Sequence, residues 1–171
     1  MFEFVSKETW LKFNAEASDV KLETSKGIYP GNAIIRNEFT PTRSTSGSAG
    51  YDIRSPFSFT VSPGERVILP TGLKWNPKTY DNPNCVLQLY PRSSLGFKYG
   101  FTLLNTVGII DADYYNNPDN EGHIMIGFTV RKEINIELGD KICQGIILPF
   151  MVSELAIPNK DRNGGIGSTG K

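Results

Sequence analysis

The chain has 171 residues, of which 39% are hydrophobic and 21% are charged, and these values suit one globular domain with a single core. Its 18 Lys and Arg residues balance its 18 Asp and Glu residues, so there is no basic signature for nucleic acid or an anionic membrane. No apolar run is long enough to cross a membrane, and the first residues lack the pattern of a signal peptide. We therefore expect a cytoplasmic protein without a nucleic-acid or membrane partner.

Residues 1–18 differ in pattern from the rest of the chain and are expected to form an N-terminal extension. Within them, residues 6–13 predict a short helix with Ser6 as its N-cap and with Trp10 and Phe13 on one face. Trp10 and Trp75 are interpreted as core residues or subunit contacts.

Residues 19–158 predict one β domain, because closely spaced Gly, Pro, Asn and Asp leave no room for long helices. Apolar patterns predict strands at 20–22, 57–61, 66–69, 85–90, 101–104, 107–110, 124–130, 134–136 and 142–148. Residues 62–65 predict a turn, and the strands at 101–104 and 107–110 are close enough in sequence to predict a hairpin. Many short strands indicate an all-β fold, namely a jelly-roll-like β-barrel or sandwich.

The remaining bulk features concern the end of the chain and its cysteine and histidine residues. Residues 159–171 are rich in Gly, Ser and Asn and predict a mobile tail. Cys85 and Cys143 lie in apolar runs and are interpreted as buried free thiols, and their spacing excludes a Cys/His zinc site. We interpret His123, the single histidine, as a solvent-facing residue at the start of a strand.

Five polar, glycine-containing segments interrupt the strand pattern. They are residues 47–53, 91–96, 104–114, 139–144 and 162–170. Each segment alone fits a turn or a linker, but in this order within an all-β chain they resemble the five motifs of the dUTPase family. The resemblance spans roughly residues 20–171. It implies the trimeric dUTPase fold and the hydrolysis of dUTP to dUMP and pyrophosphate, with Mg²⁺ as the cofactor.

The resemblance implies a role for each residue of the third motif. Asp111 matches the catalytic aspartate, which orients and deprotonates the water that attacks the α-phosphorus in line. Asn105, Gly108 and Ile110 match the uracil pocket. Tyr114 matches the residue that packs under deoxyribose and rejects a 2′-hydroxyl, although neighbouring Tyr115 is an equal rival on chemistry alone.

The other motifs are implied to hold the triphosphate. Ser93 and Gln144 match contacts to the α- and β-phosphates, and Arg92 matches a residue that ties the site together through carboxylates. Asp52 matches a network aspartate that is linked to the metal through water, while Mg²⁺ is held mainly by the phosphates. Further substrate-binding residues implied in the same way are Ser94, Gly96, Arg162, Ile166, Gly167 and Ser168.

The sequence departs from the family pattern in the fifth motif. Ile166 stands where the family has Phe, so either Ile166 forms a looser lid over uracil or an aromatic ring from Phe97, Tyr99 or Tyr115 stacks instead. Arg162 stands one residue closer to this lid position than the family's arginine does. We interpret Arg162 as the γ-phosphate ligand that the resemblance implies.

The resemblance also implies a homotrimer whose active sites are shared between subunits. Residues 115–121 look like an insertion after the third motif, and they are interpreted as a flap, a subunit contact or a protein-partner surface.

Two alternatives to the hydrolase stay open. One is a dCTP deaminase of the same fold, for which Glu121 or Glu133 could supply the acid–base carboxylate. The other is a regulatory, protein-binding member of the fold. Asp113 is interpreted as a turn carboxylate or a network partner rather than the base, and residues 140–141 are interpreted as turn residues.

Overall fold

The computed structural model describes residues 1–16 and 27–153, and these form a mostly β structure with a few short helices. The helical elements are α1 (Lys7–Glu16), α2 (Arg36–Phe39), η3 (Pro77–Thr79), α3 (Ser93–Tyr99) and η4 (Ala112–Tyr114). The strands are β1 (Phe2–Phe4), β2 (Thr42–Arg43), β3 (Tyr51–Arg54), β4 (Phe59–Val61), β5 (Arg66–Pro70), β6 (Leu73–Trp75), β7 (Cys85–Pro91), β8 (Thr102–Leu103), β9 (Gly108–Ile110), β10 (Met125–Thr129), β11 (Ile134–Ile136) and β12 (Lys141–Pro149).

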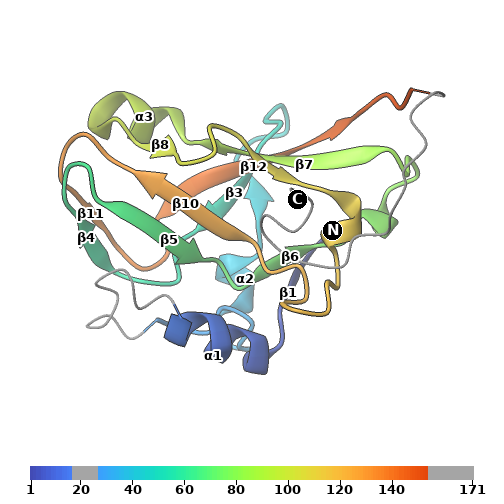
Figure 1. Cartoon of the computed structure of the whole chain (residues 1–171), viewed down its shortest axis with the longest axis horizontal. Helices are drawn as coiled ribbons and strands as arrows, with labels where there is room; N and C mark the ends of the chain where they lie inside the picture. The colour runs from blue at the N-terminus through green and yellow to red at the C-terminus, as the bar shows by residue number, and fades with distance from the viewer. Residues whose placement is uncertain (17–26, 154–171) are drawn as a thin grey trace, which may run out of the picture.

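The strands pair into one large sheet and three small ones, which form a jelly-roll-like sandwich (Figure 1). The large sheet has the order β2-β3-β12-β7-β9, and a three-stranded sheet has the order β5-β10-β8. The pairs β1-β6 and β11-β4 complete the layers. The predicted all-β fold is therefore confirmed, because alternating apolar residues turn toward a shared interior.

One continuous hydrophobic core fills the space between the layers. Phe101 and Phe128 stack at its centre, with their ring centroids 4.3 Å apart. Trp10 and Trp75 are both buried in this core, which confirms their interpretation as core residues. Large rings bury the most apolar area per residue, so these positions contribute strongly to stability.

The first sixteen residues pack onto the sandwich. β1 pairs with β6, and the helix α1 lies on the outside of the β layers (Figure 1). The amide of Thr9 donates to Ser6 Oγ at 3.2 Å, so Ser6 caps the helix as predicted. Trp10 faces inward and lies against Phe57, with ring centroids 5.5 Å apart. The predicted helix at 6–13 is confirmed and extends to Glu16.

The prediction of a hairpin between residues 101–104 and 107–110 is wrong. β8 pairs with β10 and β9 pairs with β7, so the two strands belong to different sheets. The amide of Thr106, which has a φ of 65°, donates to the Leu103 carbonyl and turns the chain from one layer to the other. Sequence separation alone cannot distinguish such a crossover from a hairpin turn.

The predicted turn at residues 62–65 and the predicted free thiols are confirmed. The Glu65 amide donates to the Ser62 carbonyl at 3.1 Å, although the strands on either side of this turn pair with other partners. Cys85 and Cys143 are buried and free, and burial raises the pKa of the Cys143 thiol to about 12. The expected strand at 20–22 lies outside the described residues.

The interpretation of His123 as solvent-facing is wrong, because its exposed fraction is 0%. Its Nε2 accepts a hydrogen bond from the Gly72 amide at 2.8 Å, and the rings of Trp10 and Phe13 lie against it. Burial lowers the pKa of His123 to about 4, while the charge of Glu121 opposes that shift. The imidazole is therefore a neutral core group. The aromatic residues that cover it come from the N-terminal segment, which a strand pattern around residue 123 does not reveal.

None of the helices in the described ranges has the length and apolarity that a membrane-crossing helix requires.

His123 makes the fold sensitive to acid. The pKa of His123 is about 4 in the folded chain, against an ordinary histidine value of 6.5, so the unfolded chain takes up a proton first as the pH falls. Stability is therefore lost as the pH drops from 6.5 toward 4. Replacing His123 by Gln, which retains an acceptor for the Gly72 amide, should remove about 2 kcal/mol of the stability loss between pH 7.5 and pH 5. Urea unfolding at one fixed protein concentration measures this, and equal losses in both proteins would contradict the prediction.

Candidate functional site

A cluster of charged side chains gathers where β3, β7 and β12 lie side by side. Asp52 on β3 forms ion pairs with Lys141 Nζ at 2.6 Å and with Arg92 Nε at 3.6 Å. Ser44 donates a hydrogen bond to the same carboxylate at 2.7 Å. Asp52 is buried, whereas the two cations are partly exposed. The cluster therefore presents positive groups outward from one buried negative charge.

The electrostatics of this cluster keep Asp52 ionised. Burial alone would raise the pKa of Asp52, but hydrogen bonds from Lys141 and Ser44, together with the charge of Arg92, hold it below its usual value. Arg92 and Asp52, which were expected to share a network, are joined directly by their ion pair. Because one carboxylate faces two cations, the cluster retains positive potential for an anionic ligand.

Lys141 and Ser44 were missed by the sequence analysis, which interpreted residues 140–141 as turn residues. Asp140 fits that interpretation, because its carboxylate accepts a hydrogen bond from the Glu137 amide. Lys141 instead reaches Asp52, because the pairing of β12 with β3 is irregular between Lys141 and Cys143. A bulge of this kind changes the direction in which a side chain points. The position of the bulge depends on the strand that pairs with β12, so local sequence does not reveal it.

A hollow of about 580 Å³ opens beside the cluster. Arg92 and Ser93 line it where β7 ends and α3 begins, and Gln144 lines it from β12. Gln144 lies opposite both Asp52 on β3 and Tyr90 on β7, so the sheet register brings the first, second and fourth motifs together. A Cβ atom on Gly50 would lie 2.4 Å from Gln144 Oε1, so a larger residue there would displace the Gln144 side chain.

The second motif forms the helix α3. Ser93 and Ser94 lie at the start of this helix, and both are exposed. The Gly96 amide donates to the Arg92 carbonyl at 3.0 Å, so this amide is already engaged within the chain. Phe97 projects from the same helix with an exposed fraction of 92% and lines the hollow. Of the three aromatic candidates for covering a base, Tyr99 packs against the core and Tyr115 donates to Glu3, whereas Phe97 is exposed.

The third motif lies around β9 and η4. Asn105 is exposed in the turn before β9, Gly108 is buried and Ile110 is partly buried within it. Asp111 is partly buried and directly precedes η4, where the Tyr114 amide donates to its carbonyl. Tyr114 is buried, and its hydroxyl donates to the His123 carbonyl at 3.0 Å. Ala112 and Asp113 line a separate hollow of about 550 Å³.

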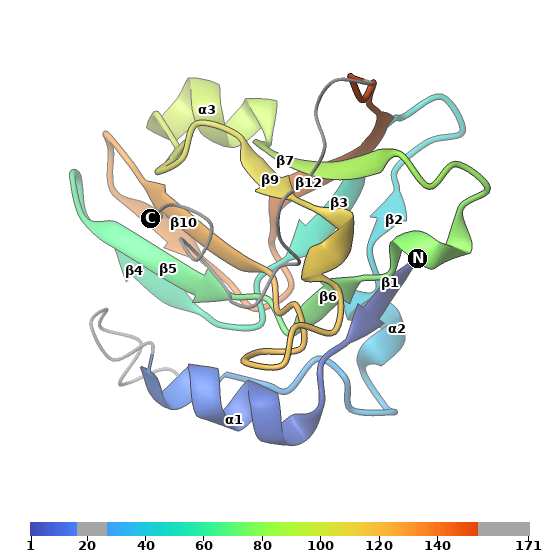
Figure 2. The same cartoon turned by 45° about the vertical axis from the view of Figure 1, so that its right-hand side comes forward.

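The two halves of the site lie apart within one chain. In the antiparallel pair of β7 and β9, Ile110 lies opposite Leu87, so Asp111 is level with residue 86 while Arg92 follows the other end of β7. Six residues of strand separate these levels by about 20 Å. Figure 2 shows α3 at one end of β7 and the segment after β9 toward the other. Asp111 therefore does not join Arg92 in one chain. The residues predicted from the tail, namely Arg162, Ile166, Gly167 and Ser168, lie outside the described residues.

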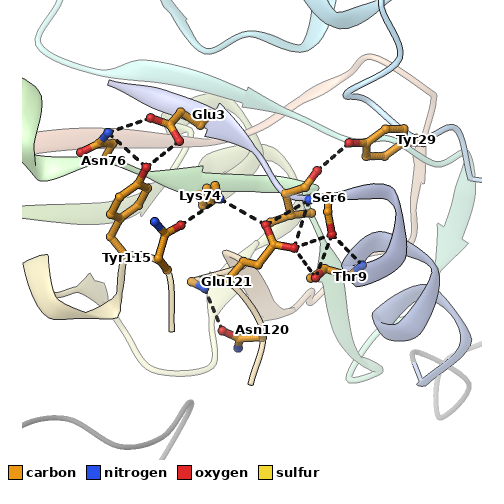
Figure 3. Close-up of polar contacts among 12 residues, drawn as sticks. Glu3, Ser6, Thr9, Tyr29, Lys74, Asn76, Tyr115, Asn120 and Glu121 are labelled. Atoms are coloured by element: carbon orange, nitrogen blue, oxygen red, sulfur yellow. Dashed lines mark hydrogen bonds and ion pairs between the residues drawn. The ribbon is translucent and has the colours of Figure 1, made fainter. Parts of the chain in front are cut away.

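The loop at 115–121 is held by the chain itself. Glu121 accepts hydrogen bonds from Ser6 and Thr9 and forms an ion pair with Lys74 at 3.2 Å (Figure 3). Partial burial alone would raise the pKa of Glu121, but the hydrogen bonds from Ser6 and Thr9 outweigh it and lower that pKa to about 2. A carboxylate held in this way is a poor proton donor, which argues against the deaminase alternative at Glu121.

No group of three or more His, Cys, Asp or Glu side chains with the geometry of a metal site occurs in residues 1–16 and 27–153. Oδ2 of Asp52 accepts from both Lys141 and Ser44, and Oδ1 of Asp52 faces Arg92 Nε. Because both oxygens are paired with cations of the chain, the described residues offer no set of direct metal ligands, and a hard cation here would depend on phosphate oxygens and water.

Comparison with known proteins agrees with these features. The family profile of dUTPase matches residues 37–170. The deoxyuridine 5′-triphosphate nucleotidohydrolase of Lactococcus lactis is 47% identical over 135 residues, covering 76% of this chain and 87% of the relative. The Haemophilus influenzae protein of that name is 38% identical over 147 residues, covering 80% and 91%. A crystal structure of dUTPase from Streptococcus mutans superimposes with a TM-score of 0.60 at 38% identity, covering 69% of this chain and 91% of that one. The chain therefore belongs to the dUTPase family.

Proposed function

We propose that this chain hydrolyses dUTP to dUMP and pyrophosphate, with Asp111 as the base for the attacking water. The observation that carries the proposal is the Asp52–Arg92–Lys141 cluster beside a hollow lined by Ser93 and Gln144, in a chain of the dUTPase family. A guanidinium and an ammonium next to neutral donors match the several oxygens of a triphosphate.

The triphosphate is held by groups from several elements. Ser93, Ser94 and Gln144 donate to the α- and β-phosphates, and Arg92 contributes positive charge while Asp52 fixes its orientation. The tail residues Arg162, Ile166, Gly167 and Ser168 close over the substrate, with Arg162 on the γ-phosphate.

The nucleoside is selected by the third motif. Asn105 and the backbone around Gly108 and Ile110 hydrogen-bond uracil. Tyr114 packs under deoxyribose, so that a ribose 2′-hydroxyl would collide with its ring. The buried position of Tyr114 and its hydrogen bond to the His123 carbonyl support this role, because they fix the ring.

The reaction is an in-line displacement. Asp111 orients a water molecule and accepts its proton as the water oxygen bonds to the α-phosphorus. The bond from the α-phosphorus to the bridging oxygen breaks, and pyrophosphate leaves with that oxygen.

Mg²⁺ is the cofactor in this proposal. When bound with the substrate, it neutralises phosphate charge and favours a reactive conformation of the triphosphate. Asp52 would hold the ion through a bridging water. A related phage phi11 dUTPase structure, which is 22% identical to this chain, is described as coordinating a structural Mg(II) ion.

The active site is completed between copies of the chain in a homotrimer. The separation of about 20 Å between the levels of Arg92 and Asp111 supports this arrangement, because one chain cannot place both groups on one triphosphate. A neighbouring copy supplies the third motif to the hollow lined by Arg92 and Gln144, and the remaining copy supplies the tail.

A substrate panel tests the reaction class. The protein with Mg²⁺ is expected to release pyrophosphate from dUTP in clear preference to dTTP, dCTP and UTP, because the proposed pocket excludes a 5-methyl group and a 2′-hydroxyl. Pyrophosphate release and ammonia release are measured in parallel. Ammonia from dCTP would favour the deaminase instead.

Replacing Asp111 by Asn tests the proposed base. Loss of a positioned general base should lower kcat for dUTP by about 10²- to 10⁴-fold with a smaller change in KM. The matched control is Asp113→Asn, which removes an exposed carboxylate two residues away and should retain activity. Wild-type turnover by Asp111→Asn would refute the mechanism.

A complementation experiment tests the shared site. Arg92→Ala and Asp111→Asn chains are each expected to be inactive, whereas a mixture that is unfolded and refolded together should regain about a quarter of wild-type activity. In an equal mixture, half of the chains retain Arg92 and the other half retain Asp111. Random assembly therefore places an intact Arg92 next to a neighbour's intact Asp111 in about a quarter of the sites. Each variant refolded alone is the control, and a mixture that stays inactive would contradict sharing.

A further inference from the structure

The loop between Tyr114 and His123 is closed by hydrogen bonds within itself. The Asn116 amide donates to the Glu121 carbonyl at 3.1 Å, and the Glu121 amide donates to the Asn117 carbonyl at 2.7 Å. The Asn117 amide in turn donates to the Tyr114 carbonyl at 3.2 Å. A displacement of Glu121 is therefore passed to Tyr114 through two consecutive backbone contacts.

The ring of Tyr114 is fixed by the other end of the same loop. Its hydroxyl donates to the His123 carbonyl and accepts from Asn120 Nδ2 at 2.7 Å. Gly122, at a φ of 77°, lets the chain return so closely that a Cβ atom there would lie 2.4 Å from the Tyr114 carbonyl oxygen. The position of the Tyr114 ring is therefore coupled to the position of the loop at 115–121.

Glu121 connects this loop to the N-terminal segment. Its carboxylate accepts from the Ser6 amide at 3.1 Å, from Ser6 Oγ and from Thr9 Oγ1 at 2.5 Å, all at the start of α1 (Figure 3). Lys74 on β6 donates to the same carboxylate and to Asn116, and Tyr115 donates to Glu3 on β1. A helix start favours an anion, so the carboxylate and α1 stabilise each other.

We propose that Glu121 is a positioning residue, which acts through this loop to fix Tyr114 and so sets the preference of the enzyme for deoxyribose over ribose. The N-terminal segment and residues 115–121 thereby act together as one support for the third motif. The inference rests on the proposed function, in which Tyr114 contacts the sugar.

The test compares dUTP with UTP as substrates. Glu121→Gln preserves the shape of the side chain but removes its charge, so it weakens the bonds from Ser6, Thr9 and Lys74. The ratio of kcat/KM for dUTP to that for UTP is expected to fall about three- to tenfold, the scale on which contiguous contact networks modulate coupling. A rise in kcat/KM for UTP should account for most of the change, because a less firmly held Tyr114 ring collides less with the 2′-hydroxyl, while kcat for dUTP is kept since Asp111 is retained.

The matched control is Asp119→Asn, which removes a carboxylate from the exposed part of the same loop and should leave the ratio unchanged. Thr9→Val is a milder second variant that removes one hydroxyl donor to Glu121 and is expected to lower the ratio in the same direction. It keeps the inference testable if Glu121→Gln folds poorly.

The outcomes separate the two proposals. The inference is overturned if the wild type prefers dUTP but the ratio is unchanged in both Glu121→Gln and Thr9→Val. Such a result, even with a lower Tm, would show that the contacts of Glu121 with the N-terminal segment stabilise the fold only. If the wild type itself fails to prefer dUTP, the proposed function fails together with the inference. A lower ratio in the two variants, with Asp119→Asn unchanged, supports both.

Discussion

The pairing of β7 with both β12 and β9 is the constraint on which the site depends. β12 brings Gln144 and, through β3, Asp52 to the end of β7 where Arg92 stands. β9 runs the opposite way and carries Asp111 toward the other end. Because strands extend by about 3.3 Å per residue, no side-chain rotation can close that gap. The sheet that assembles the proposed phosphate-binding half of the site thus also keeps the proposed base away from it.

Charge in the proposed phosphate-binding half is arranged around the buried carboxylate of Asp52. Asp52 holds Lys141 and Arg92 in place, so these cations need little further ordering when an anion arrives. Two cations to one carboxylate leave the surplus positive charge that a triphosphate requires. A chain with no net charge can therefore still concentrate positive charge at one place, which is what the proposed triphosphate site needs.

The N-terminal segment and the loop at 115–121 are best understood together. The two segments are far apart in sequence, but in the structure Glu121 joins them, and Trp10 and Phe13 cover the buried His123. The loop bonds to Tyr114 directly, and the N-terminal segment contacts Tyr115 and His123 near the two ends of that loop. Two features that look peripheral in the sequence therefore support the third motif in the fold.

The sequence by itself determined the strand-rich fold, the capped helix at its start, the buried free thiols and the family, because alternating apolar residues, Ser6 and the five ordered motifs are local patterns. Tertiary structure alone decided which strands pair, so the expected hairpin at 101–110 became a crossover between sheets. It also decided that a bulge in β12 aims Lys141 at Asp52 and that His123 is buried under residues from the other end of the chain. These outcomes depend on contacts between residues distant in sequence, and local periodicity carries no information about such contacts.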